Sequence, residues 1–172
     1  MKQFTITPAA PDLPRADDLL DAAFGHERRL KASYRLREGA SPAAGLSFAA
    51  HDDESKRLAG VISFWPLRLS GDGRKALLLG PLAVHPDFQG HRLGTTLMKH
   101  GIEAAAERGH ELLFLVGDEP FYGRFGFRMV PEGRITLPGP FDPRRLLYLE
   151  LTPGALSTAS GLLLPEHRWK GE

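Results

Sequence analysis

The sequence predicts an α/β fold built on a mixed sheet, and three observations lead to this prediction. A strand-like segment, a glycine-containing loop, a helix-like segment and a second strand-like segment follow one another over residues 76–116, which is the order of a βαβ unit with parallel strands. The chain from residue 46 to residue 76 alternates between strand-like runs and tight turns, which is typical of antiparallel pairing. Apolar residues at helical spacing over residues 16–24 indicate an amphipathic helix.

The N-terminal half is expected to hold two helices and four strands before the central loop. The helices cover residues 16–24 and 28–37, and Gly39 ends the second one. Each expected strand is a run of apolar or β-branched residues bounded by turn residues. The four strands cover residues 4–7, 46–50, 58–69 and 76–84.

The strand at residues 76–84 is the one we expect at the centre of the sheet. Its run of leucines is apolar on both faces, as in a strand that is buried on both sides. Gly80 and Pro81 interrupt this run, and proline has no N–H group to donate to a neighbouring strand. We therefore expect this strand to bulge or to splay from its neighbour at that point.

The C-terminal half is expected to begin with a helix and to continue with a second buried strand. The helix carries apolar residues and glycines on one face from Gly94 to Ala105. The buried strand covers residues 112–116, and a last strand is expected at residues 146–151. Residues 162–169 are expected to cover either the sheet or a partner.

Composition and charge exclude several classes of function. Of the 172 residues, 42% are hydrophobic and 25% are charged, which is ordinary for a globular domain. The chain contains no cysteine, so it has no disulfide, no cysteine-containing zinc site and no cysteine nucleophile. A net charge of +1 lacks the strong basic balance expected of a protein that binds duplex nucleic acid.

The hydropathy pattern predicts a cytoplasmic protein without a membrane partner. Residues 1–14 lack the apolar core of a signal peptide, and no apolar run reaches the roughly 18 residues of a membrane span. The seven histidines show no spacing typical of metal ligands, so we expect no metal.

The loop at residues 85–94 is the first candidate site. It joins a strand to the N-terminus of a helix, where backbone N–H groups and the helix dipole favour an anion such as phosphate. Its glycines, Gly90 and Gly94, do not have the spacing of a P-loop or of a dinucleotide-binding motif. An ordinary strand–helix turn is the alternative interpretation.

Two segments resemble landmarks of the GNAT N-acetyltransferase superfamily. Residues 82–94, LAVHPDFQGHRLG, are similar to its acyl-CoA signature, a strand followed by Q/R-x-x-G-x-G/A. Residues 121–127, FYGRFGF, are similar to its second landmark, F-Y-x-x-x-G-F. The surroundings of both segments also resemble a bacterial branch of predicted N-acetyltransferases, and the resemblance covers about residues 3–130.

The resemblance implies a single N-acetyltransferase domain over residues 1–172. Its sheet is expected to be strongly twisted, with about six or seven strands, a splayed central strand and helices on both faces. The core is expected at about residues 3–151, and residues 152–172 are expected to cover the sheet or the acceptor side.

The resemblance also implies which residues bind acetyl-CoA, the expected co-substrate. Pantetheine would lie along the central strand, and pyrophosphate on the backbone at the start of the helix. The residues at these positions are Leu82, Ala83, Val84, Gln89, Gly90, His91, Arg92, Leu93, Gly94 and Thr95.

Arg92 departs from the family pattern, because it stands where the motif has its first glycine. If this position needs a positive φ, a residue other than glycine costs about 1–2 kcal/mol. Its guanidinium is expected either to bind a phosphate of CoA or to face solvent.

Tyr122 is the residue that the resemblance implies as the general acid, which protonates the departing CoA thiolate. A phenol with a pKa of about 10 is protonated at neutral pH, so this role is chemically permitted. A core aromatic residue is the alternative. Asp118 is our candidate for the base that accepts a proton from the amine, with Glu119 beside it, although such residues often only cap a strand or helix.

The predicted function is transfer of acetyl from acetyl-CoA to a primary amine, by direct attack in a ternary complex. Backbone amides around Val84 would stabilise the oxyanion. The acceptor is expected to be a small-molecule or peptide amine, and a homodimer is an arrangement common in the superfamily. Three alternatives stay open: an acyl-CoA sensor without turnover, an acyltransferase for longer acyl donors or a carrier protein, and a serine hydrolase centred on Ser47.

Overall fold

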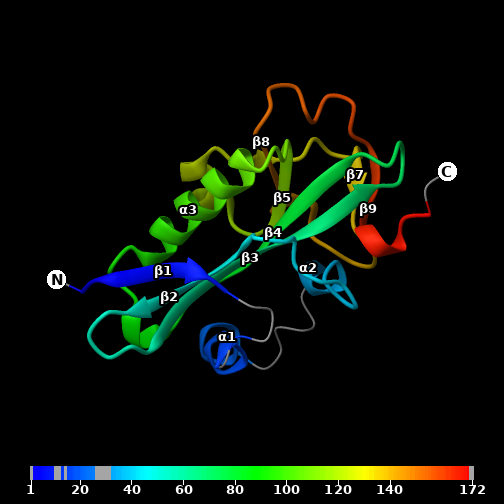
Figure 1. Cartoon of the computed structure of the whole chain (residues 1–172). Helices are drawn as coiled ribbons and strands as arrows, with labels where there is room; N and C mark the ends of the chain where they lie inside the picture. Colours follow the sequence, from blue (N-terminus) through cyan, green and yellow to red (C-terminus); the bar gives the residue numbers. More distant parts are fainter. Residues whose placement is uncertain (1, 10–12, 14, 26–31, 171–172) are drawn as a thin grey trace.

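The computed structural model describes residues 2–9, 13, 15–25 and 32–170. These residues form nine strands, and the strand order is β1-β2-β3-β4-β5-β8-β6, with β9 beside both β3 and β7 (Figure 1). The strands are β1 (Phe4–Pro8), β2 (Ser47–Asp52), β3 (Leu58–Leu69), β4 (Lys75–Val84), β5 (Leu112–Val116), β6 (Arg128–Met129), β7 (Ile135–Thr136), β8 (Leu146–Glu150) and β9 (Gly161–Pro165).

The sheet is mixed, which confirms the predicted fold class. Strands β1 to β4 form an antiparallel meander, and β4 pairs with β5 in parallel through the helix that crosses between them. Strand β8 returns antiparallel to β5. The parallel pair therefore lies between two antiparallel regions, as the order of the segments in the sequence predicts.

Strand β4 splays from β5 after only two paired positions. Leu77 pairs with Leu113 and Leu78 with Phe114, and in the described chain no later residue of β4 has a partner on β5. On its other side β4 bulges, because Gly80 and Pro81 together face one residue of β3. The predicted bulge and the predicted splay are both confirmed at the position of the proline.

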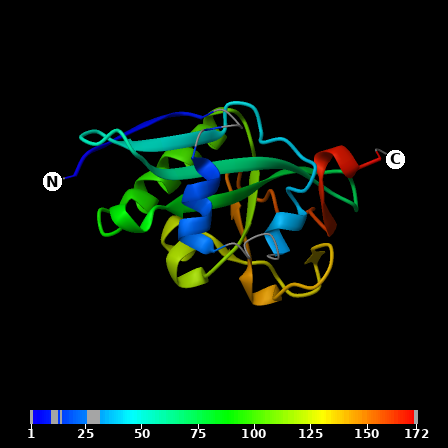
Figure 2. The same ribbon diagram turned by 90° about the horizontal axis from the view of Figure 1, so that it is seen from below.

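Helices cover both faces of the sheet (Figure 2). Helix α3 (Leu93–Glu107) packs through Leu97 and Met98 on the face that carries Leu77 and Leu113. Helix α1 (Ala16–Phe24) and helix α2 (Ala32–Arg35) lie on the opposite side. Helix α4 (Glu119–Tyr122) follows β5 directly. None of the helices formed by the described residues is long and apolar enough to cross a membrane.

The C-terminal segment packs on the same face as α2. Leu156 and Leu163 belong to one buried cluster with Leu36, Leu78 and Phe114. The short 3₁₀ helices of the chain are η2 (Pro86–Phe88), η3 (Gly123–Phe125), η4 (Pro143–Arg145) and η5 (Glu166–Arg168).

Two expectations about individual elements need correction. The sheet has nine strands rather than six or seven. Strands β6 and β7 have only two residues each and show no recognisable period. Strand β9 follows the strand expected to be the last, and it pairs with β3 within the sheet instead of covering it. The second helix ends at Arg35 and not at Arg37, because the following backbone N–H groups bond three residues back, as in a turn. Residues 28–31 of that predicted helix lie outside the described residues.

Candidate functional site

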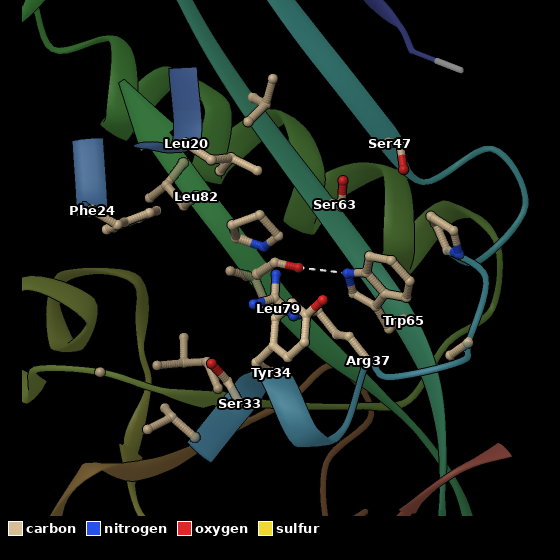
Figure 3. Close-up of a pocket in the computed structure, with 18 of the residues that line it drawn as sticks. Leu20, Phe24, Ser33, Tyr34, Arg37, Ser47, Ser63, Trp65, Leu79 and Leu82 are labelled. Carbon is tan, nitrogen blue, oxygen red and sulfur yellow. Dashed lines mark hydrogen bonds between the residues drawn. The ribbon is translucent and has the colours of Figure 1, made fainter. Parts of the chain in front are cut away.

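A cavity of about 910 Å³ opens where β4 and β5 diverge. Its walls come from α1, the turn after α2, strands β2 to β4, the end of β5, Tyr122 and the η4 segment. Figure 3 shows the central part of this cavity, with Leu79 and Leu82 of β4 on its floor. The cavity therefore lies on the α1 and α2 side of this gap, and none of the described residues of α3 lines it.

The open edge of β4 forms the first part of the site. Leu82 and Val84 are half-buried and pack on the α3 side, whereas Ala83 is buried on the α1 side against Leu19. Because β5 has departed, the main-chain groups on this edge face no neighbouring strand in the described part of the molecule. An extended ligand can therefore pair with this edge as an additional strand would.

The loop after β4 forms the second part. His85 Nδ1 accepts a hydrogen bond from the Asp87 N–H at 3.1 Å, so this histidine shapes the turn. Gln89, Gly90 and His91 are exposed beside the start of α3. Thr95 follows in the first turn of the helix and is half-buried.

Leu93 and Gly94 begin α3, and each has a different surrounding. Leu93 is only 3% exposed, so its side chain belongs to the core and only its backbone faces the loop. A Cβ atom on Gly94 would lie 3.8 Å from Val84 and 4.0 Å from Phe121, which places the helix start next to β4 and α4.

The backbone of Arg92 has the left-handed conformation that is expected at this position, where the family motif has a glycine. Its φ of 59° and ψ of 24° lie in the left-handed region, and its side chain makes no capping hydrogen bond in the described chain. The side chain is exposed at the mouth of the loop. The first N–H groups of α3 therefore have no cap from this side chain, which leaves them to an anion.

Tyr122 lies in α4 below the gap between β4 and β5. Its ring contacts the edge of Phe121 with a centroid distance of 4.8 Å, and it packs directly on Gly117, where a Cβ atom would lie 2.4 Å from the ring. Burial raises the pKa of the phenol above its usual value of 10, and the nearby Asp118 carboxylate raises it further. Tyr122 is therefore protonated at neutral pH, as an acid must be.

Asp118 and Glu119 differ in their contacts. Asp118 lines the cavity near Tyr122, is 76% exposed, and has its Oδ1 atom 3.6 Å from Nε of Arg145. It makes no side-chain capping hydrogen bond among the described residues. Glu119 Oε2 instead accepts a hydrogen bond from the Met129 N–H at 3.2 Å, which fixes β6. The structure therefore brings Asp118 together with Tyr122 and gives Glu119 a structural role.

Two side chains from distant segments complete the cavity. Trp65 donates a hydrogen bond from Nε1 to the Gly80 carbonyl at 2.6 Å (Figure 3). The guanidinium carbon of Arg37 lies 5.5 Å from the centroid of the Tyr34 ring and 5.9 Å from that of the Trp65 ring. The bulge of β4 and the turn after α2 are thus connected through one indole ring.

Residues 13–127 match the family model described as Acetyltransferase (GNAT) family. The chain belongs to the GNAT acetyltransferase family. It is 28% identical over 152 residues to N-acetyltransferase YhbS of Escherichia coli (strain K12), which covers 88% of this chain and 89% of YhbS.

Two solved structures of this kind are similar over nearly the whole chain. The crystal structure of Escherichia coli YhbS in complex with CoA has a TM-score of 0.77 and 25% identity, and the match covers 99% of this chain and 93% of YhbS. A GNAT acetyltransferase from Brucella melitensis in complex with acetyl-CoA has a TM-score of 0.65 and 25% identity, covering 88% and 90% of the two chains.

Several cavity residues of this GNAT acetyltransferase have no motif in the sequence. Trp65 and Arg37 are separated by 28 positions, and Arg145 by far more from both. The period of two along β3 indicates that Trp65 shares a face with Val61 and Ser63, and this was the one available signal. Neither the contact of Trp65 with Gly80 nor the position of Arg37 follows from a local pattern.

The serine hydrolase interpretation is wrong. Ser47 is the first residue of β2 and the chain continues as a strand to Asp52, whereas a nucleophile elbow needs a strand before the serine and a helix after it. The described residues also contain no group of three histidine, aspartate or glutamate side chains that could hold a metal ion.

Proposed function

We propose that this GNAT acetyltransferase transfers the acetyl group of acetyl-CoA to a primary amine by direct attack in a ternary complex. The observation that carries the proposal is the single cavity, which brings the open edge of β4 together with a protonated tyrosine and an exposed carboxylate. The relatives solved with CoA and with acetyl-CoA support the choice of donor.

The donor would occupy the two places that the fold leaves open. The pantetheine arm would pair with the β4 edge at Leu82, Ala83 and Val84, whose neighbour β5 has departed. The pyrophosphate would lie on the backbone between Gln89 and Thr95, at the uncapped start of α3. The thioester would then lie at the bulge, next to the cavity that receives the acceptor.

The amine must lose a proton before it attacks the thioester. An alkylammonium with a pKa of about 10.4 costs about 4–5 kcal/mol to deprotonate at pH 7, so a nearby base accelerates the reaction. Asp118 accepts this proton and, because it is exposed, exchanges it with solvent. The amine nitrogen then forms a bond to the carbonyl carbon, becomes positively charged and releases its second proton to solvent.

Collapse of the resulting tetrahedral intermediate breaks the bond between carbon and sulfur. Tyr122 donates its phenolic proton to the departing thiolate and recovers a proton from solvent. Pro81 has no N–H, and alternate N–H groups of β4 point to β3, so the backbone donors that can stabilise the oxyanion are the edge-facing ones between Leu82 and Val84. The products are the N-acetylated amine and CoA.

The test combines donor binding with turnover. Acetyl-CoA at about 100 times its Kd stabilises a protein by about 2.7 kcal/mol, which raises Tm by about 5–10 °C at this chain length. With a panel of primary amines, release of CoA should depend on Tyr122. Tyr122→Phe should lower kcat by about 10²-fold or more and leave the rise in Tm with acetyl-CoA unchanged.

The acid role of Tyr122, the transfer reaction and the identity of the donor can each be contradicted separately. Unchanged turnover in Tyr122→Phe would remove the acid role of this residue. A rise in Tm without release of CoA from any amine would favour a sensor, whereas a larger rise with long-chain acyl-CoA would favour another acyl donor. No rise with acetyl-CoA or CoA would contradict the donor assignment.

A further inference from the structure

The indole of Trp65 reaches from β3 to the bulge of β4 (Figure 3). Trp65 lies opposite Leu78 in the register of the two strands, so Gly80 is its diagonal neighbour, within reach of a large aromatic side chain. Its Nε1–H donates a hydrogen bond to the Gly80 carbonyl at 2.6 Å. An indole has a single N–H donor, so this bond uses the hydrogen-bonding capacity of the side chain.

Packing holds the ring of Trp65 in place. The side chain is half-buried and lies against the buried cluster that contains Leu36, Leu78 and Phe114. It also lines the cavity. A tryptophan side chain has only two torsion angles, so packing of the ring also fixes the direction of its N–H.

Gly80 gives the bulge rotational freedom. Its φ of 142° lies in the region that favours glycine, and a glycine backbone can also adopt many other conformations. A Cβ atom at Gly80 would meet no described heavy atom within 4 Å apart from its chain neighbours, so packing around this residue is loose. The hydrogen bond from Trp65 therefore restrains a peptide group that the surrounding packing leaves free.

Pro81 transmits the orientation of this peptide group to Leu82. The Gly80 carbonyl belongs to the planar group that includes the Pro81 nitrogen, and the proline ring fixes the φ angle of Pro81. The ψ angle of Pro81 is then the one soft torsion between the Gly80 carbonyl and the N–H of Leu82. Fixing the carbonyl therefore restricts the direction of this N–H.

The N–H of Leu82 faces the open edge of β4. Directly after β4, the His85 N–H donates to the Ala59 carbonyl on the β3 side at 2.8 Å. Donors alternate between the two sides of a strand, so the N–H groups of Val84 and Leu82 point the other way, to the edge that β5 has left. These are the edge-facing donors that the proposed reaction places at the oxyanion.

We infer that Trp65 is a positioning residue of this acetyltransferase, which holds the Gly80 carbonyl so that the Leu82 N–H points to the thioester oxygen. The inference rests on the proposed function, because it concerns the oxyanion that forms in that reaction. Donors that are oriented before the charge develops need no reorganisation in the transition state, so their orientation affects kcat more than binding. Trp65 acts through the backbone and needs no contact with the reacting atoms.

Infrared spectroscopy of bound acetyl-CoA, labelled with ¹³C at the carbonyl, tests this role without any acceptor. A hydrogen bond to a thioester carbonyl lowers its stretching frequency, so the band reports whether a donor is aligned with the oxygen. We expect the bound band of the wild type to lie below that of free acetyl-CoA. It should return toward the free value in Trp65→Phe, which keeps an aromatic ring and removes the N–H.

A second replacement separates the N–H from the shape of the ring. Benzothienylalanine at position 65 has sulfur in place of the N–H and nearly the shape of tryptophan, and it should cause the same return of the band. Both replacements should lower kcat by about 10–10²-fold with the primary amine that the wild type acetylates fastest. The KM for this amine in the benzothienylalanine variant, and the rise in Tm with acetyl-CoA in both, should change little.

Trp169→Phe is the matched control, because it is the same substitution at the other tryptophan of the chain. Trp169 is also half-buried, but its ring lies against Gly73 and Arg68, and it is not among the described residues that line the cavity. This variant should keep the carbonyl band and the kcat of the wild type.

The outcomes separate this inference from the proposed function. An unshifted band in the wild type, or an unchanged band or kcat in the benzothienylalanine variant, would overturn the positioning role and leave acetyl transfer standing. A band shift that depends on the Trp65 N–H, without release of CoA from any amine, would support the role and contradict the proposed reaction. No binding of acetyl-CoA would contradict both.

Discussion

Arg92 occupies a position whose backbone conformation is unfavourable for any residue with a Cβ atom. The start of α3 turns through the left-handed region at φ 59°, where a side chain with a Cβ atom is strained by about 1–2 kcal/mol. Gly90, two positions earlier, has a φ of 86° at no such cost. A strained arginine at the expected phosphate position is explained if its charge contributes to binding of the donor.

Replacing Arg92 should therefore separate stability from donor affinity. In Arg92→Gly, relief of strain exceeds the extra entropy of the unfolded chain, and the free energy of unfolding should rise by about 0.5 kcal/mol. Loss of the guanidinium should weaken acetyl-CoA binding several-fold. Arg92→Asn keeps a residue that tolerates this conformation and removes the charge, so it should share the loss of affinity. Unchanged affinity in both variants would assign the side chain to solvent.

Gly117 positions Tyr122 through the absence of a side chain. A methyl group there would lie 2.4 Å from the tyrosine ring, far inside van der Waals contact. Gly117→Ala should displace the ring and lower kcat by about tenfold or more, with little change in the affinity for acetyl-CoA. Gly123→Ala is the control, because its new methyl group would meet only Glu119 at 3.8 Å. Equal kcat in both alanine variants would show that the ring position is not important for turnover.

At the scale of an element, α2 has four residues and cannot be stable as an isolated helix. Arg35 holds it in place by donating from Nε to the Pro138 carbonyl at 2.6 Å and from Nη2 to the Pro140 carbonyl. The loop around residues 138–140 therefore anchors the element that carries Tyr34 and leads to Arg37. This contact joins segments about 100 residues apart, and no sequence pattern in either segment predicts it.

Arg35→Met should make the part of the cavity wall formed by α2 more mobile, without changing the binding of acetyl-CoA. We expect faster amide exchange over residues 33–38 and a raised KM for the amine, with the rise in Tm on binding acetyl-CoA unchanged. Arg144→Met is a matched control, since Arg144 is 84% exposed and its side chain contacts Asp142 at the start of the η4 segment. A raised KM in both variants would mean that loss of positive charge, and not the anchor, is responsible.

At the scale of the whole molecule, the sheet separates two groups of helices. Helix α3 covers one face of the sheet, and helices α1 and α2, whose residues contribute to the lining of the cavity, cover the other (Figure 2). Among the described residues, β4 has no partner on β5 after Leu78. The same divergence of β5 that leaves the β4 edge unpaired also opens the cavity, which receives the amine in the proposed reaction.

The stability of the molecule toward acid should depend on Asp52, which is 1% exposed at the end of β2. Hydrogen bonds from the Ser55 hydroxyl and N–H, together with Lys2, lower the pKa of this carboxyl from 3.8 to about 2. A carboxyl whose pKa is lower in the folded state stabilises that state at pH values above its pKa in the unfolded chain. This contribution to stability is lost as the pH falls through the pKa of the folded state. The free energy of unfolding should therefore fall between about pH 4 and pH 2.

Urea unfolding across this pH range tests the role of Asp52. Asp52→Asn should be less stable at pH 7 and should show a shallower dependence on pH between 4 and 2. Glu54→Gln is the control, because Glu54 is 89% exposed and lies 3.9 Å from Lys2. Parallel curves for the wild type and Asp52→Asn would place the acid sensitivity in other carboxylates.

Local patterns along the chain were sufficient to predict the mixed sheet, the positions of β3, β4, β5 and α3, the bulge at Gly80 and Pro81, and the family. These features depend on neighbours in sequence: the period of apolar residues, the missing N–H of proline and two short motifs. Tertiary structure alone decided the β9 pairing, the short α2 and the cavity, in which Arg37, Trp65 and Arg145 come together from distant segments. Such contacts depend on how the packed elements cross in space, and a periodicity confined to one segment carries no information about them.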